Sequence, residues 1–199
     1  VLPSTRHVAH RGVEPSLKAV FVAPTASVIG NVQVGQSSSI WYGSVVRGDV
    51  NNVFIGSRTV VGDSAVIHVA GIAGDKPAII GSDIIIGPRA TIHACTLRDG
   101  CLIGAGATIL DGAVVSEGAV VAPGATVTAN TVIPRGQMWA GTPAAYAKDV
   151  SEDMLDEIQL RVKQNYHLAV AHAAECAKGV EEIELDERKW EEQASNDPM

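Results

Sequence analysis

The sequence predicts an all-β solenoid, a parallel β-helix of hexapeptide repeats, followed by a C-terminal α-helix. The first observation is a six-residue step between Ile55 and Ile109, in which a β-branched aliphatic residue is followed by a small residue, often glycine. The second is a hydrophobic content of 46% with only 4% aromatic residues, so that Val, Ile, Leu and Ala must supply the core. A fixed short period is the signature of a solenoid, in which each turn buries its apolar edge against its neighbours.

The six-residue steps can be followed from Val22 to Ile133. They are disturbed by an insertion at Asn51 and Asn52, by a loop over 71–78, and by one step that is a residue short. Three steps make one triangular coil, so residues about 18 apart stack on the same face. The hexad pattern resembles that of left-handed parallel β-helices, and we take the handedness from this resemblance.

After Ser151 the spacing of apolar residues becomes helical. Ser151 is the expected N-cap, and the pair Lys178-Gly179 is a stop signal. The polar face of this helix is acidic, which argues against a helix lying on a membrane surface. For His167 and His172, which are five residues apart, we expect surface roles. The four expected segments are an N-terminal extension (1–20), the β-helix (21–145), the C-terminal helix (146–179) and an acidic tail (180–199).

Charge and cysteine usage exclude several classes of protein. The net charge of -7 argues against nucleic-acid binding, which needs a basic face. No run of 18 apolar residues exists to span a membrane. The three cysteines form no CxxC pair, which favours a reducing compartment, and we expect Cys95 and Cys101 to lie in the core or at corners.

Two histidines on the ladder raise the question of function. His68 follows Ile67 and His93 follows Ile92, so each is second in its hexad. Their separation of 25 residues, less seven for the loop, equals one coil. The two imidazoles should therefore stack on one face, about 5 Å apart if coils repeat at strand spacing. This geometry suits two ligands of one metal, and it equally suits a hydrogen-bonded pair at a surface or interface.

Six motifs are spread over nearly all of residues 20–145. They are Arg47-Gly-Asp-Val-Asn51, Asp63 through Ala70, Ile86-Gly87, Ala90 through Thr96, Ala107 through Gly112, and Trp139 through Ala144. Together these motifs resemble the γ-class carbonic anhydrases. The segments 165–174 and 181–184 are similar in particular to the mitochondrial γ-carbonic anhydrase subunits that are bound to respiratory complex I.

The resemblance implies a trimer with zinc or iron at each subunit interface. One subunit would give two histidines, matched here by His68 and His93, and its neighbour a third. The position of that third histidine is Pro88, which cannot bind a metal. The family's Asn and Gln near the metal are replaced by Val60 and Gly62. The family's paired Arg and Asp are present as Arg47 and Asp49, expected as an ion pair supporting the subunit contact.

These departures lead to three hypotheses. The first is a non-catalytic or half-competent subunit of a heterotrimer, bound to membrane-arm subunits of complex I on the matrix side of the mitochondrial inner membrane. It would be peripheral to the membrane, inactive alone, and able to share an interface metal site. The second is an active γ-carbonic anhydrase that hydrates CO2. The third is an acyltransferase, because hexapeptide β-helices also host acyl-CoA transfer with a histidine base.

Overall fold

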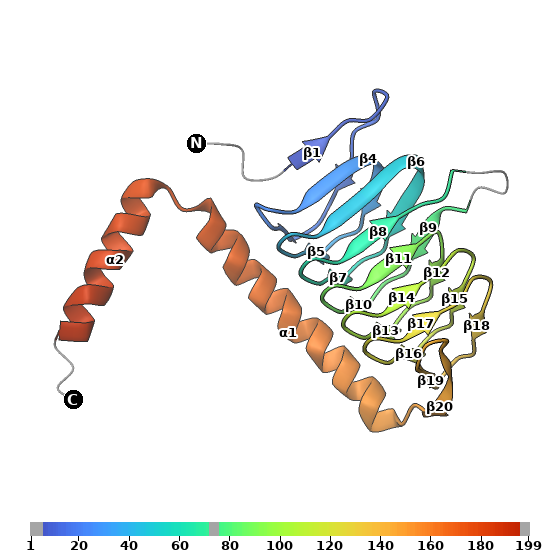
Figure 1. The fold of residues 1–199 in the computed structure, drawn as a ribbon. Coiled ribbons are helices and arrows are strands. Elements are labelled where there is room, and N and C mark those ends of the chain that lie inside the picture. The colour runs from blue at the N-terminus through green and yellow to red at the C-terminus, as the bar shows by residue number, and fades with distance from the viewer. Residues whose placement is uncertain (1–5, 72–75, 196–199) are drawn as a thin grey trace.

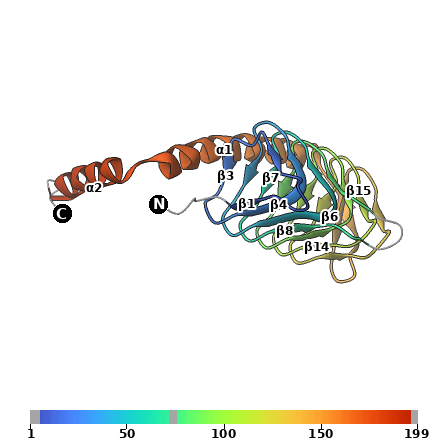
Figure 2. The same ribbon diagram turned by 90° about the horizontal axis from the view of Figure 1, so that it is seen from above.

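The computed structural model describes residues 6–71 and 76–195, and it shows a parallel β-helix of about seven turns with a long helix along its side (Figure 1). The predicted fold class, a left-handed parallel β-helix of hexapeptide repeats with a C-terminal helix, is confirmed. Each coil is a triangle, and each face of the prism is a stack of short parallel strands. Figure 2 shows the three-sided outline from above.

The strands fall into two hydrogen-bonded sheets. In the first sheet the long strands β4 and β6 cross a corner of the prism, so that one end of β6 pairs with β8 and the other with β9. The first sheet thus covers two faces, which we call the histidine face (β8, β11, β14, β17) and the second face (β9, β12, β15, β18). The other sheet forms the third face, and its last pair, β19 and β20, is antiparallel.

The bounds of the strands on the first two faces are β1 Arg6–Val8, β2 Ser16–Leu17, β4 Ser27–Val34, β6 Val45–Ile55, β8 Val66–His68, β9 Ala78–Ile80, β11 Thr91–His93, β12 Thr96–Leu97, β14 Thr108–Ile109, β15 Val114–Val115, β17 Thr126–Val127 and β18 Val132–Ile133. Those of the third face are β3 Phe21–Val22, β5 Ser39–Ile40, β7 Val60–Val61, β10 Ile85–Ile86, β13 Leu102–Ile103, β16 Val120–Val121, β19 Gln137–Ala140 and β20 Ala145–Asp149. Within the first twenty residues, β1 and β2 both pair with β4.

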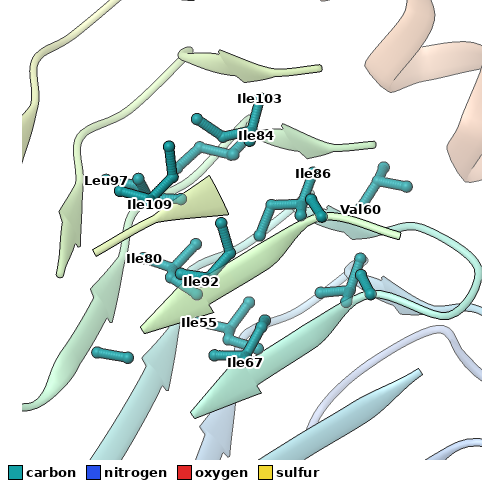
Figure 3. Close-up of a cluster of buried hydrophobic side chains, with 14 of the residues drawn as sticks. Ile55, Val60, Ile67, Ile80, Ile84, Ile86, Ile92, Leu97, Ile103 and Ile109 are labelled. Atoms are coloured by element: carbon teal, nitrogen blue, oxygen red, sulfur yellow. The ribbon is translucent and has the colours of Figure 1, made fainter. Parts of the chain in front are cut away.

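The core is a set of aliphatic columns along the solenoid axis. Ile67, Ile92 and Ile109 pair in register and are fully buried, and Figure 3 shows them beside the columns of the other faces. Alternate residues of a strand point to opposite sides, so each short strand gives one side chain to the core and turns the next outward. Each buried aliphatic side chain contributes about 1.5–3 kcal/mol relative to an exposed one.

Helix α1 (Glu152–Ala177) runs back from the last coil towards the first coils and covers part of the third face (Figure 1). The predicted N-cap is confirmed, because the Ser151 side chain accepts a hydrogen bond from the Met154 amide. Ile158, Val162 and Ala169 are its buried residues. After the predicted stop at Lys178, a second helix, α2 (Val180–Ser195), extends beyond the solenoid. No helix of the described residues is long and apolar enough to cross a membrane.

The three thiols differ sharply in accessibility, and this gives a first testable prediction. Cys95 and Cys101 are buried, as expected, whereas Cys176 is exposed. Burial raises the pKa of Cys95 to about 12, and because the thiolate is the reactive form, this thiol should be inert in the folded chain. Ellman's reagent should therefore modify one thiol per native chain and three after denaturation. A Cys176→Ser variant should show no native labelling, and fast modification of a second thiol would contradict the buried placement.

Candidate metal half-site

The histidine face carries a cluster of polar side chains at the ends of its strands. His68 ends β8 and His93 ends β11, and the two residues pair in register, as do Arg47 and His68. The imidazole centroids are 5.2 Å apart, and His68 Nδ1 lies 3.2 Å from His93 Nε2. The predicted stacking of the two histidines on one face is thus confirmed, in agreement with the expected spacing of one coil.

Charged side chains surround this pair on both sides. On the side of the first coils, Arg47 Nη2 lies 2.8 Å from His68 Nε2, and Arg47 Nε forms an ion pair of 3.0 Å with Asp49. On the other side, Asp111 Oδ1 lies 2.5 Å from His93 Nδ1. Burial alone would raise the pKa of the Asp49 carboxyl. Its backbone hydrogen bond, the adjacent His68 ring and the Arg47 charge together have the larger effect, so the pKa of Asp49 lies below its ordinary value.

Asp111 was not among the predicted site residues, although a signal for it exists. It lies 18 residues after His93, the length of one coil, in the turn that follows β14.

The side chains of His68 and His93 are 23% and 31% exposed, so the cluster is open to a neighbouring molecule. In the part of the chain that the structure describes, no three His, Cys, Asp or Glu side chains are placed to hold a metal ion.

The three positions at which the resemblance implies a departure from the family are Val60 in β7, Gly62 after β7, and Pro88. Pro88 is exposed in the turn before β11, whereas His93 ends that strand, so the two residues mark opposite ends of β11. Gly62 packs so tightly here that an added Cβ would lie 2.8 Å from Pro88 N. Val60, two residues earlier in β7, is only 6% exposed. His68 and His93 thus lie at one end of their strands, and Pro88 with Gly62 lies at the other end of β11.

Helix α1 carries two further histidines, His167 and His172, which lie in different environments. His167 is exposed, as expected. The expectation of a surface role for His172 is wrong: its Nδ1 is 2.9 Å from the Tyr42 hydroxyl, and its ring packs among Phe21, Trp41 and Tyr42. The reason is that α1 reaches the first coils, where an otherwise polar helix position meets an aromatic cluster. Trp139 packs against the core, as predicted.

Comparison with known proteins identifies the family. Gamma carbonic anhydrase 2, mitochondrial, of Arabidopsis thaliana is 45% identical over 172 residues, covering 85% of this chain. A protein of Methanocaldococcus jannaschii that is named a probable carbonic anhydrase is 42% identical over 71% of this chain and 87% of its own length. The chain belongs to the γ-carbonic anhydrase family. It spans 62% of the length of the Arabidopsis relative.

The same β-helix occurs in transferases. The crystal structure of a hexapeptide transferase family protein from Anaplasma phagocytophilum matches with a TM-score of 0.76 and 35% identity, covering 82% of this chain and 96% of that one. No protein-family model matches the sequence.

Proposed function

We propose that the chain is a half-competent γ-carbonic anhydrase subunit, which supplies two histidines to a metal site shared with a neighbour and cannot supply the third ligand in return. The observation that carries this proposal is the contrast between its two corners. His68 and His93 are stacked and hydrogen-bonded to charged partners, whereas Pro88 offers no ligand and Gly62 is closely packed beneath it. Its part in the assembly is then mainly structural.

The imidazoles of His68 and His93 can fill two coordination positions of a metal ion, which is not a complete site. Two imidazoles at adjacent coils, one of which is hydrogen-bonded through its second nitrogen to a carboxylate, are typical of ligands to zinc or iron. A catalytic zinc site takes three protein ligands, so a neighbouring chain must complete it. When bound, such a metal acts as a Lewis acid and provides a nucleophile at neutral pH for CO2 hydration. His68 and His93 would hold it, with Arg47, Asp49 and Asp111 positioned around them.

We further propose that the partners are γ-carbonic anhydrase subunits in a heterotrimer, in which the Arg47–Asp49 ion pair supports the subunit contact. The names of the Arabidopsis relatives place those proteins in mitochondria, which supports the same address for this chain. Attachment to membrane-arm subunits of complex I, peripheral to the matrix side of the inner membrane, follows from the resemblance of residues 165–174 and 181–184 alone. Native mass spectrometry of the particle isolated with this chain tests these partners.

Two other functions make different predictions for the purified chain. An active γ-carbonic anhydrase is favoured by the names of the relatives, and it would contain stoichiometric metal and hydrate CO2 without a partner. An acyltransferase is favoured only by the hexapeptide transferase with the same fold, and it would turn over acetyl-CoA. The structure-based proposal predicts neither activity in the chain alone.

Restoring the missing ligand tests the half-competent site directly. A Pro88→His variant should bind markedly more zinc per trimer than the parent chain, because a third imidazole then faces His68 and His93 across each interface. Pro88→Ala is the matched control, since it frees the backbone without adding a ligand, and it should stay at the parent level. Metal content and oligomeric state are measured together by native mass spectrometry. A parent trimer already saturated with zinc, or a Pro88→His trimer with no gain, would contradict the proposed site.

A further inference from the structure

Asp111 makes the closest polar contact of the histidine cluster and has no role in the sequence-based prediction of the site. Its Oδ1 lies 2.5 Å from His93 Nδ1, across one coil. The backbone of Asp111 is also anchored, because its carbonyl accepts a hydrogen bond of 2.9 Å from the Asn130 amide of the following coil. The carboxylate is therefore presented to His93 from a turn that is held in place on its far side.

The two ends of the cluster determine where the imidazole protons lie. At one end, the Arg47 guanidinium can only donate, so its 2.8 Å contact with His68 Nε2 requires a lone pair on that nitrogen. Asp49 Oδ1, 3.2 Å from the same nitrogen, can only accept and would favour the opposite tautomer. Its contact is the longer of the two, and the other oxygen of this carboxylate is paired with Arg47 Nε. The proton of neutral His68 is then on Nδ1, which faces His93 Nε2 at 3.2 Å.

The other end gives the same assignment independently. An ionised carboxylate can only accept, so His93 Nδ1 must donate to Asp111, which leaves the lone pair of neutral His93 on Nε2. His93 Nε2 is the acceptor that His68 Nδ1 requires. The hydrogen bonds thus run in one direction, from Arg47 through His68 and His93 to Asp111. The longer contact of Asp49 Oδ1 with His68 Nε2 is the one contact of the cluster that does not follow this direction.

From this geometry we infer that Asp111 is a positioning residue: it holds His93 in the tautomer that has the proton on Nδ1 and the lone pair on Nε2. In the metal-free chain it also holds His68 in the same tautomer, through the hydrogen bond between the two rings. A histidine that binds a metal typically donates its other ring N–H to a carboxylate, which fixes the ring and raises the basicity of the ligand atom. The ligand role of the two histidines rests on the proposed function, whereas their tautomers do not.

The tautomers can be observed in the full chain without metal. In long-range proton–nitrogen NMR spectra recorded at mildly alkaline pH, His68 and His93 should both carry the proton on Nδ1. In an Asp111→Ala variant the Nε2–H form of His93 should become populated, because the acceptor is gone. Asp156→Asn removes the same charge on the exposed side of α1 and should leave both tautomers unchanged. Asp111→Leu, of similar size and without an acceptor, replaces Asp111→Ala if the latter fails to fold.

A second measurement separates this inference from the proposed function. In the Pro88→His background, removing the Asp111 carboxylate should weaken zinc binding by about 10–100-fold, the usual loss for such a partner. A tautomer shift without a change in zinc affinity would preserve the positioning role and overturn the ligand role. Unchanged tautomers in the Asp111 variants would overturn the inference, whatever the metal measurement shows.

Discussion

A Gly62→Gln variant, which introduces the residue type that the resemblance implies for this position, is expected to lose about 3 kcal/mol of unfolding free energy or more. The reason is the backbone of the next coil. A Cβ at residue 62 would lie 2.8 Å from Ile86 O, 2.8 Å from Pro88 N and 2.9 Å from Gly87 C. All three are main-chain atoms at the end of β10 and in the segment that follows it. They cannot rotate away as a flexible side chain would, so the coil itself has to shift.

Gly106 provides the control for this prediction. It has a positive φ of 66°, and an added Cβ would meet nothing within 4 Å. A Gly106→Ala substitution should therefore cost only the strain of the left-handed conformation, about 1–2 kcal/mol. Urea unfolding monitored by circular dichroism measures both variants. Equal stability of Gly62→Gln and Gly106→Ala would show that the segment 86–88 yields easily and that close packing does not maintain glycine at position 62.

The packing at Gly62 also bears on how the altered corner can be repaired. Gly62 and Pro88 touch, so a glutamine at 62 would press on the very turn that has to present a histidine at 88. Val60 is almost fully buried, and an amide there would need a hydrogen-bond partner in place of apolar contacts. Gly62 and the turn at Pro88 thus pack as one unit. A single Pro88→His exchange at an exposed position is consequently a cleaner test of the half-site than restoring all three residues.

The sequence predicted the solenoid and the histidine register because both depend on local, periodic information. The hexapeptide pattern places an inward-facing aliphatic side chain at every sixth residue. Once the loop over 71–78 is recognised, counting these steps is enough to stack His68 on His93. The ion pair of Arg47 and Asp49 was likewise predicted from the family pattern and is present within the chain. Its part in a subunit contact remains a prediction.

Asp111 and His172 could not be placed by the same counting. Asp111 is one coil from His93, but many residues share that spacing, and only the turn geometry brings its carboxylate to the ring. His172 lies on a helix whose spacing shows which side is apolar but not which coil the helix reaches. Its contact with Tyr42, 130 residues earlier in the chain, depends on the length and direction of α1. Such contacts depend on tertiary packing, which single-sequence periodicity does not encode.

An Ile92→Ala variant is expected to be destabilised by about 3–4 kcal/mol, in the upper part of the range for large-to-small core substitutions. Ile92 is fully buried between Ile67 and Ile109, and the coils above and below are held at fixed spacing by ladder hydrogen bonds, so they cannot collapse into the cavity. Thr91→Ala, on the outward position of the same strand, should cost less than about 1 kcal/mol and controls for strand propensity. Urea unfolding compares the two variants, and equal losses of stability would contradict the columnar core.

The packing of Ile92 also orients His93. Because His93 follows Ile92 directly, the buried Ile92 side chain that stabilises the coil also fixes the direction of the imidazole. In NMR spectra His93 should therefore show broader signals in Ile92→Ala than in Thr91→Ala, which would link the packing of the core to the order of the metal half-site.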